Sequence, residues 1–110
     1  MKTLMIATVA LMSVAVVSAA SAQPVVRLSD AQFVKLARCK GLAKSPALGA
    51  VETAGFDAAI KANKRGRADF IVEKAMTTQD KALSEANRAD EARKAELIAE
   101  RNGACQVFAG

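Results

Sequence analysis

The chain has 110 residues, a formal net charge of +5, and no histidine, tyrosine or tryptophan. Without histidine it lacks the commonest general base and metal ligand, so its composition argues against an enzyme and predicts neither a metal site nor a cofactor. Its length supports one small domain.

The N-terminus has the features of a secretory signal peptide. Lys2 precedes an apolar run over residues 4–17, and small residues follow up to Ala22. A short basic start, an apolar middle and an A-x-A site are typical of such a peptide. We therefore predict that residues 1–22 are cleaved and that residues 23–110 form a periplasmic or secreted domain. An uncleaved anchor is the alternative, because residues 4–22 together are just long enough to span a bilayer.

The two cysteines, Cys39 and Cys105, are predicted to form a disulfide. The exported domain would hold 20 large apolar side chains and 19 alanines, which make only a thin core. Exported proteins form disulfides readily, and closing a loop of this length stabilises a fold by about 4 kcal/mol. A redox pair or a pair of metal ligands is the alternative, but there is no C-x-x-C motif and no histidine to complete a site.

The first helix is predicted to begin after a short extended segment at residues 23–28. Ser29 stands three residues before Gln32, which is the spacing of a capping box. The helix is expected to bury Phe33, Leu36 and Ala37, and to end near residue 40 with Gly41 as its C-cap.

The segment Leu28-Ser29-Asp30-Ala31-Gln32 resembles the L-T-x-x-Q element of the envelope-stress helical chaperones. The resemblance covers five residues, has serine in place of threonine, and occurs once where that family has two copies. A capping box accounts for the same residues, so we assign no family from it.

Two shorter helices are predicted next. Ser45 and Pro46 have the residue types of an N-cap and a first helical residue, and predict a short helix over residues 47–53. A firmer helix is expected over residues 56–64, with Phe56 and Ile60 on its apolar face.

A long C-terminal helix is predicted over residues 67–101, after a break at Gly66. Thr77-Thr78 is the alternative break, because a hydroxyl there could cap a new helix. The apolar positions follow a period of about 3.6 residues, and are Ile71, Val72, Ala75, Met76, Ala82, Leu83, Ala86, Ala89, Leu97 and Ile98. Charge pairs at helical spacing are expected between Glu85 and Arg88, Asp90 and Lys94, and Glu91 and Lys94.

These elements predict an all-α fold, a disulfide-stapled helical hairpin or three-helix arrangement with one long C-terminal helix. If successive helices run antiparallel, Cys39 and Cys105 reach the same end of the molecule. The long helix would extend beyond its neighbours and present mainly alanines to a partner.

No catalytic constellation is evident. Ser45 beside Lys44 suggests a Ser-Lys nucleophile, but helix capping explains the same serine. Gly66 stands alone, so there is no glycine-rich phosphate loop, and we expect no small-molecule substrate.

Basic residues are concentrated in the first half of the mature chain. Residues 27–67 contain nine lysines and arginines against three acids, whereas residues 68–110 contain six against eight. Lys61, Lys64, Arg65 and Arg67 surround the predicted turn and are the candidate site for an anionic surface, such as lipid or lipopolysaccharide. A solvated surface is the simpler interpretation. Nucleic acid is not the expected partner, because there is no tyrosine or tryptophan for base stacking.

The sequence therefore predicts an exported, non-catalytic protein that acts by binding or as a structural module of the cell envelope. Its partner would be another envelope protein, docked on the long helix. The alternative is a cationic binder of anionic envelope surfaces.

Overall fold

The computed structural model describes residues 27–109, so the predicted signal peptide and its cleavage site lie outside the described residues. The described part is all-α, as predicted, and contains no strand. Its helices are α1 (Asp30–Lys44), α2 (Ala54–Lys64), α3 (Asp69–Arg88) and α4 (Glu91–Asn102), with short 3₁₀ helices η2 (Pro46–Leu48) and η3 (Ala104–Phe108). None of the helices in this range is long and apolar enough to cross a membrane.

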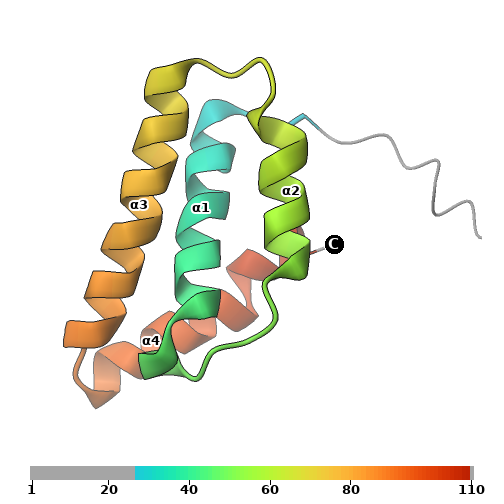
Figure 1. Cartoon of the computed structure of the whole chain (residues 1–110). Helices are drawn as coiled ribbons and strands as arrows, with labels where there is room; N and C mark the ends of the chain where they lie inside the picture. Colours follow the sequence, from blue (N-terminus) through green and yellow to red (C-terminus); the bar gives the residue numbers. More distant parts are fainter. Residues whose placement is uncertain (1–26, 110) are drawn as a thin grey trace, which may run out of the picture.

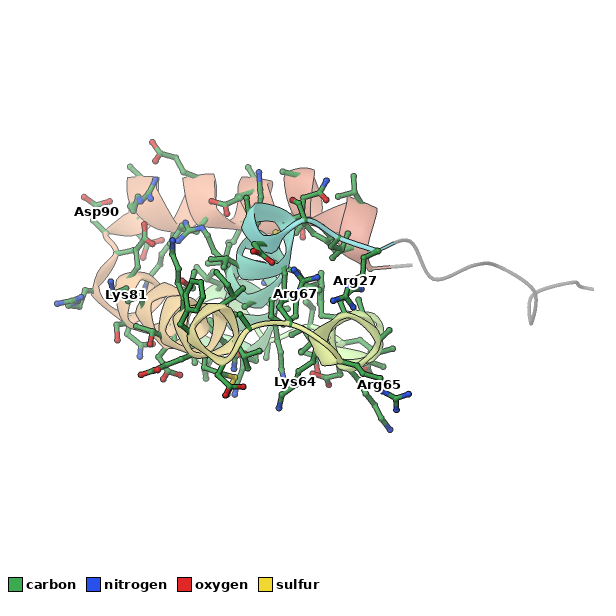
Figure 2. The ribbon with its side chains drawn as sticks, turned by 90° about the horizontal axis from the view of Figure 1, so that it is seen from above. Arg27, Lys64, Arg65, Arg67, Lys81 and Asp90 are labelled. Atoms are coloured by element: carbon green, nitrogen blue, oxygen red, sulfur yellow. A yellow bond between two sulfur atoms is a disulfide. The ribbon has the colours of Figure 1, made fainter. Side chains whose placement is uncertain are left out.

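Helix α1 is the centre of the fold. Figure 1 shows α2 running antiparallel to α1, and α3 running antiparallel to α2. The most extensive helix packing joins α1 to α3, and α2 also packs against α1, so the three helices form one group with α1 in contact with both others. Seen from above in Figure 2, α4 lies across the side of α1 opposite to α2 and α3.

The start of α1 confirms the predicted capping box. The Ser29 hydroxyl accepts a hydrogen bond from the Gln32 amide at 3.2 Å, and the Gln32 side chain accepts one from the Ser29 amide at 2.9 Å. Capping therefore accounts for the short segment that resembles the chaperone element. The predicted buried face is also confirmed, because Phe33, Leu36 and Ala37 are each at most 2% exposed.

The predicted end of α1 at Gly41 is wrong. The helix continues through Gly41 to Lys44. A Cβ atom at Gly41 would lie 2.5 Å from the carbonyl oxygen of Gln79 and 2.9 Å from the Cβ of Ala82. The glycine is therefore needed for the close approach of α1 and α3, which a periodicity argument along one helix does not reveal.

The segment after α1 is less helical than predicted. Only η2 forms in place of the expected helix over residues 47–53, and Gly49 ends it with a φ of 76°. Ser45 and Pro46 occupy the predicted N-cap and first helical positions, now of η2, but the Ser45 side chain makes no capping hydrogen bond. The chain then returns alongside α1, where the Val51 amide donates to the Ala43 carbonyl at 2.8 Å.

The turn at Gly66 is confirmed. Helix α2 ends at Lys64, Gly66 has a φ of 75°, and α3 begins at Asp69. Glycine adopts this left-handed conformation without the steric penalty that a Cβ atom brings. The alternative break at Thr77-Thr78 is wrong, because both threonines lie inside α3.

The single helix predicted over residues 67–101 is wrong. It is divided into α3 and α4 at Ala89-Asp90, where Asp90 has an extended backbone and its side chain accepts from the Arg93 amide at 2.8 Å. This N-cap satisfies an amide that would otherwise lack a partner, and it starts a new helix direction. Asp90 therefore caps α4 and does not pair with Lys94, whereas the predicted pair of Glu91 and Lys94 forms at 3.6 Å.

The core is small, and five of the fourteen buried apolar residues in the described part are alanine. The main cluster gathers apolar side chains from α1, η2, α2, α3 and α4 around the two cysteines. Five of the ten residues of the stripe predicted on the C-terminal helix are buried, including Ile71, Ala82 and Leu97, and four are half-buried. Met76 is the main exception, because 55% of it is exposed.

We predict that Gly41→Ala lowers the free energy of unfolding by about 1–3 kcal/mol, because the added methyl group overpacks the contact between α1 and α3. Urea unfolding of the oxidised protein measures this change. The control is Thr77→Ala at an exposed position of α3, which should change stability by no more than about 0.5 kcal/mol. Equal effects of the two substitutions would contradict the close approach at Gly41.

Candidate interaction site

The predicted disulfide between Cys39 and Cys105 is present. It joins α1 to η3 with a Cα–Cα distance of 5.5 Å, and both cysteines are fully buried. Neither cysteine in the described residues is free, so neither is available there as a metal ligand or redox thiol. A buried disulfide is consistent with an oxidising, extracytoplasmic location.

The described residues do not assemble a catalytic or metal-binding cluster. No group of three histidine, cysteine, aspartate or glutamate side chains in residues 27–109 is placed to hold a metal ion. The Ser45 hydroxyl is fully buried and has no hydrogen-bond partner there. An activated nucleophile is hydrogen-bonded to its base, so this serine does not have the geometry of one.

Arg67, predicted as part of an anionic-surface site, points into the molecule. Its side chain is 3% exposed and donates to the carbonyl oxygens of Asn63 at 2.9 Å and Leu28 at 2.8 Å. It also forms an ion pair with Asp30 and lies 4.6 Å from the ring centroid of Phe33. Arg67 therefore fastens the start of α1 to the turn before α3, and it is not available to an external anion.

The remaining three predicted residues, Lys61, Lys64 and Arg65, are exposed and form no ion pair within residues 27–109. Arg27 joins them, because its guanidinium donates to the Arg65 carbonyl at 2.8 Å. Figure 2 shows Lys64 and Arg65 pointing away from α1, whereas Arg67 points toward it. We call Arg27, Lys61, Lys64 and Arg65 the basic end; no sequence signal links Arg27 to the other three.

The outer side of α2 carries a shallow hollow next to the basic end. Its volume is about 410 Å³, and it is lined by Ala58, Lys61, Ala62 and Arg65. The helix buries Phe56 and Asn63 on its other side, so the hollow faces away from α1. We call this feature the α2 hollow.

Helix α3 presents a second exposed surface, which we call the α3 flank. Met76 is its centre and lies between two exposed carboxylates, Glu73 and Asp80. Residues three and four apart are neighbours on a helix, so both acids lie beside Met76. Val72 and Leu83 are half-buried next to it and complete the flank.

The position of the α3 flank leaves it uncovered. At about 100° per residue, Met76 falls on the opposite side of the buried stripe from Glu85, which faces α4. Neither Glu73 nor Asp80 forms an ion pair with another residue of the described part. Phe70 is 70% exposed and lies about 120° around α3 from Met76, with Glu73 three residues from each of them.

A network of ion pairs centred on Arg38 holds α4 against the rest of the fold. The Arg38 guanidinium contacts Glu100 of α4 through two hydrogen bonds, at 2.7 and 3.0 Å, and Glu85 of α3 at 2.8 Å. Glu85 also pairs with Arg93, which contacts Glu96 at 2.7 Å. Glu85 therefore bridges α1 and α4, and the predicted pair between Glu85 and Arg88 is not formed.

These contacts shift the pKa values of their members. Hydrogen bonding to Glu100 raises the pKa of Arg38 above its ordinary value, against the opposing effect of burial. Hydrogen bonds from Arg38, and then from Arg93, lower the pKa of Glu85. Within this network, Glu85 therefore stays ionised to a lower pH than an isolated glutamate.

A buried arginine that the sequence did not single out also positions α4. Arg101 is 6% exposed and donates to the carbonyl oxygens of Leu48 at 3.1 Å and Gly49 at 2.8 Å. These hydrogen bonds satisfy the carbonyl groups at the end of η2, where the helix stops and its own hydrogen bonds end. The partners of Arg101 are uncharged carbonyl oxygens more than 50 residues away in the chain. The spacing of charged residues in the sequence therefore could not predict this contact.

The chain was compared with protein-family models, curated proteins and solved structures, and no match was found in any of the three.

We predict that Glu85→Gln lowers the free energy of unfolding by about 1 kcal/mol at neutral pH, a modest value because the carboxylate is one-third exposed. Because the pKa of Glu85 is lowered in the folded state, its contribution is complete above the unfolded value of about 4.3 and disappears as pH falls through the folded value. The difference between wild type and variant should therefore shrink in urea unfolding series taken toward acid pH.

The matched control is Glu91→Gln, because the Glu91 side chain is 95% exposed and has a single long contact with Lys94. This substitution should leave both the stability and its dependence on pH nearly unchanged. A pH-independent difference between Glu85→Gln and wild type would contradict the role given to the network.

Proposed function

We propose that this protein is a non-catalytic module of the cell envelope that binds another protein on the α3 flank. The observation that carries the proposal is the exposure of Met76 between two unpaired carboxylates on a cross-linked scaffold. Met76 and the half-buried Val72 and Leu83 form an apolar centre with charged neighbours, which is the composition of a protein interface with an apolar core and a polar rim.

The folded position of α4 supports the choice of the α3 flank. A single long helix would have offered an extended docking surface, but α4 packs back on α1 and buries Leu97 and Arg101. The other large exposed apolar residues of the described part, Val51, Phe70 and Val107, do not lie on this flank. The α3 flank combines an exposed apolar side chain with carboxylates that form no ion pair within residues 27–109.

The envelope location rests on the disulfide together with the predicted signal peptide. We propose that residues 1–22 are removed and that the bridged domain acts outside the cytoplasm. The intact mass of the protein from native envelope, alkylated without prior reduction, should equal that of residues 23–110 without an alkyl group. A full-length mass would instead assign a retained anchor, and two added alkyl groups would contradict the bridge.

The basic end supports a second candidate function, attachment to an anionic envelope surface. Its four cations are exposed and Arg27 brings a contribution from a distant part of the chain. The outer side of α2, however, carries only Ala58 and Ala62 between the charges, so it lacks the bulky apolar side chains that insert into a membrane. We therefore place this function second.

We predict that a photo-reactive residue at position 76 forms a specific cross-link to a protein in the native envelope. The matched control is position 81, since Lys81 is exposed on a different side of the same helix. Equal labelling from both positions would contradict a docking site on the α3 flank. Absence of cross-links, together with binding to acidic vesicles that is released by salt, would assign the second candidate function.

A further inference from the structure

We infer that the partner of the α3 flank is a second copy of this chain, bound through its α2 hollow. This inference rests on the proposed function, because it names the partner of the same flank. Its basis is that one chain presents two exposed surfaces with complementary shape and opposite charge.

The shapes of the two surfaces are complementary. Met76 stands out from α3 with 55% of its surface exposed, and its unbranched side chain adapts to an irregular site. The α2 hollow has a volume of about 410 Å³ and a floor formed by two small side chains, Ala58 and Ala62. Small residues on a helix let a neighbouring helix approach closely, so the methionine can enter the hollow as a knob.

The charges of the two surfaces are also complementary. Glu73 and Asp80 flank Met76, and Lys61 and Arg65 flank the hollow. All four are exposed, and none forms an ion pair with another side chain of residues 27–109. When Met76 enters the hollow, its two acids face the two bases, which sets the orientation of the contact.

The two surfaces cannot meet within one molecule. The hollow lies on the outer side of α2, opposite to the buried residues of that helix, so it faces away from the rest of the molecule. The contact is therefore heterologous, with a different surface used on each copy. Each added copy leaves one free flank and one free hollow, so the assembly grows into a ring or a linear array.

The contact is small, and its strength depends on charge. One knob and two ion pairs give an interface at the lower end of the size range for specific complexes. The predicted association is therefore weak and reversible, rises with concentration, and decreases as salt screens the ion pairs.

Sedimentation velocity of the oxidised mature chain, over a concentration series at low and at raised salt, tests the inference. The wild type should show a sedimentation coefficient that increases with concentration at low salt. Two variants remove the complementarity from opposite sides: E73K/D80K makes both surfaces basic, and K61E/R65E makes both acidic. Each variant alone should associate at least tenfold more weakly than wild type.

An equimolar mixture of the two variants should associate again, because each basic surface then meets an acidic one. Circular dichroism of each variant checks that the exposed substitutions leave the fold intact. Met76→Ala should also weaken association about tenfold, whereas Val107→Ala, at a residue that is 78% exposed elsewhere, should have no effect. A wild type that stays monomeric, or association that both charge variants leave unchanged, would overturn the inference.

The outcome separates this inference from the proposed function. A monomeric purified chain that still cross-links from position 76 to a different protein overturns self-assembly and leaves the protein-binding function standing. A monomeric chain without any cross-link from position 76 overturns both.

Discussion

The disulfide between Cys39 and Cys105 is the constraint on which the rest of this structure depends. It lies at the centre of the main core cluster and joins the central helix α1 to the last turn of the chain. Helix α4 has only Leu97 and Arg101 as buried residues, and burying a leucine contributes about 1.5–3 kcal/mol. The bridge contributes more than that by restricting the unfolded chain, so it is what holds this sparsely buried helix to the fold.

Polar contacts determine where α4 lies once the bridge has brought it close. Arg38 reaches Glu85 and Glu100 from the middle of α1, and Arg101 reaches the carbonyl groups that follow η2. At the start of α1, Arg67 makes a similar set of polar contacts and holds the N-terminus of this helix against the turn at Gly66. These three arginines are therefore structural, although Arg67 was predicted to belong to a surface site, and their contacts supplement a small apolar core.

The use of these arginines inside the fold changes how the surface is interpreted. With Arg67 turned inward, the basic end consists of the outer residues of α2 together with Arg27. The acids of the second half of the chain are divided as well: Glu85 and Glu100 are paired internally, whereas Glu73 and Asp80 remain exposed beside Met76. The described residues therefore present one basic and one acidic-apolar surface, and the proposed docking rests on these two surfaces.

The sequence by itself determined the features that depend on neighbouring residues. These are the all-α class, the capping box at Ser29 and Gln32, the left-handed turn at Gly66, and the disulfide, which was predicted from two cysteines and a predicted export signal. Only the tertiary structure decided that Gly41 is a contact between helices, that the chain turns at Asp90, and that Arg67 and Arg101 point inward. Each of these depends on groups that lie far apart in the chain or, at Asp90, on packing that makes a capped turn more stable than a continuous helix. A periodicity of 3.6 residues runs unchanged through such a turn, because it records which side of a helix is apolar and not where the helix ends.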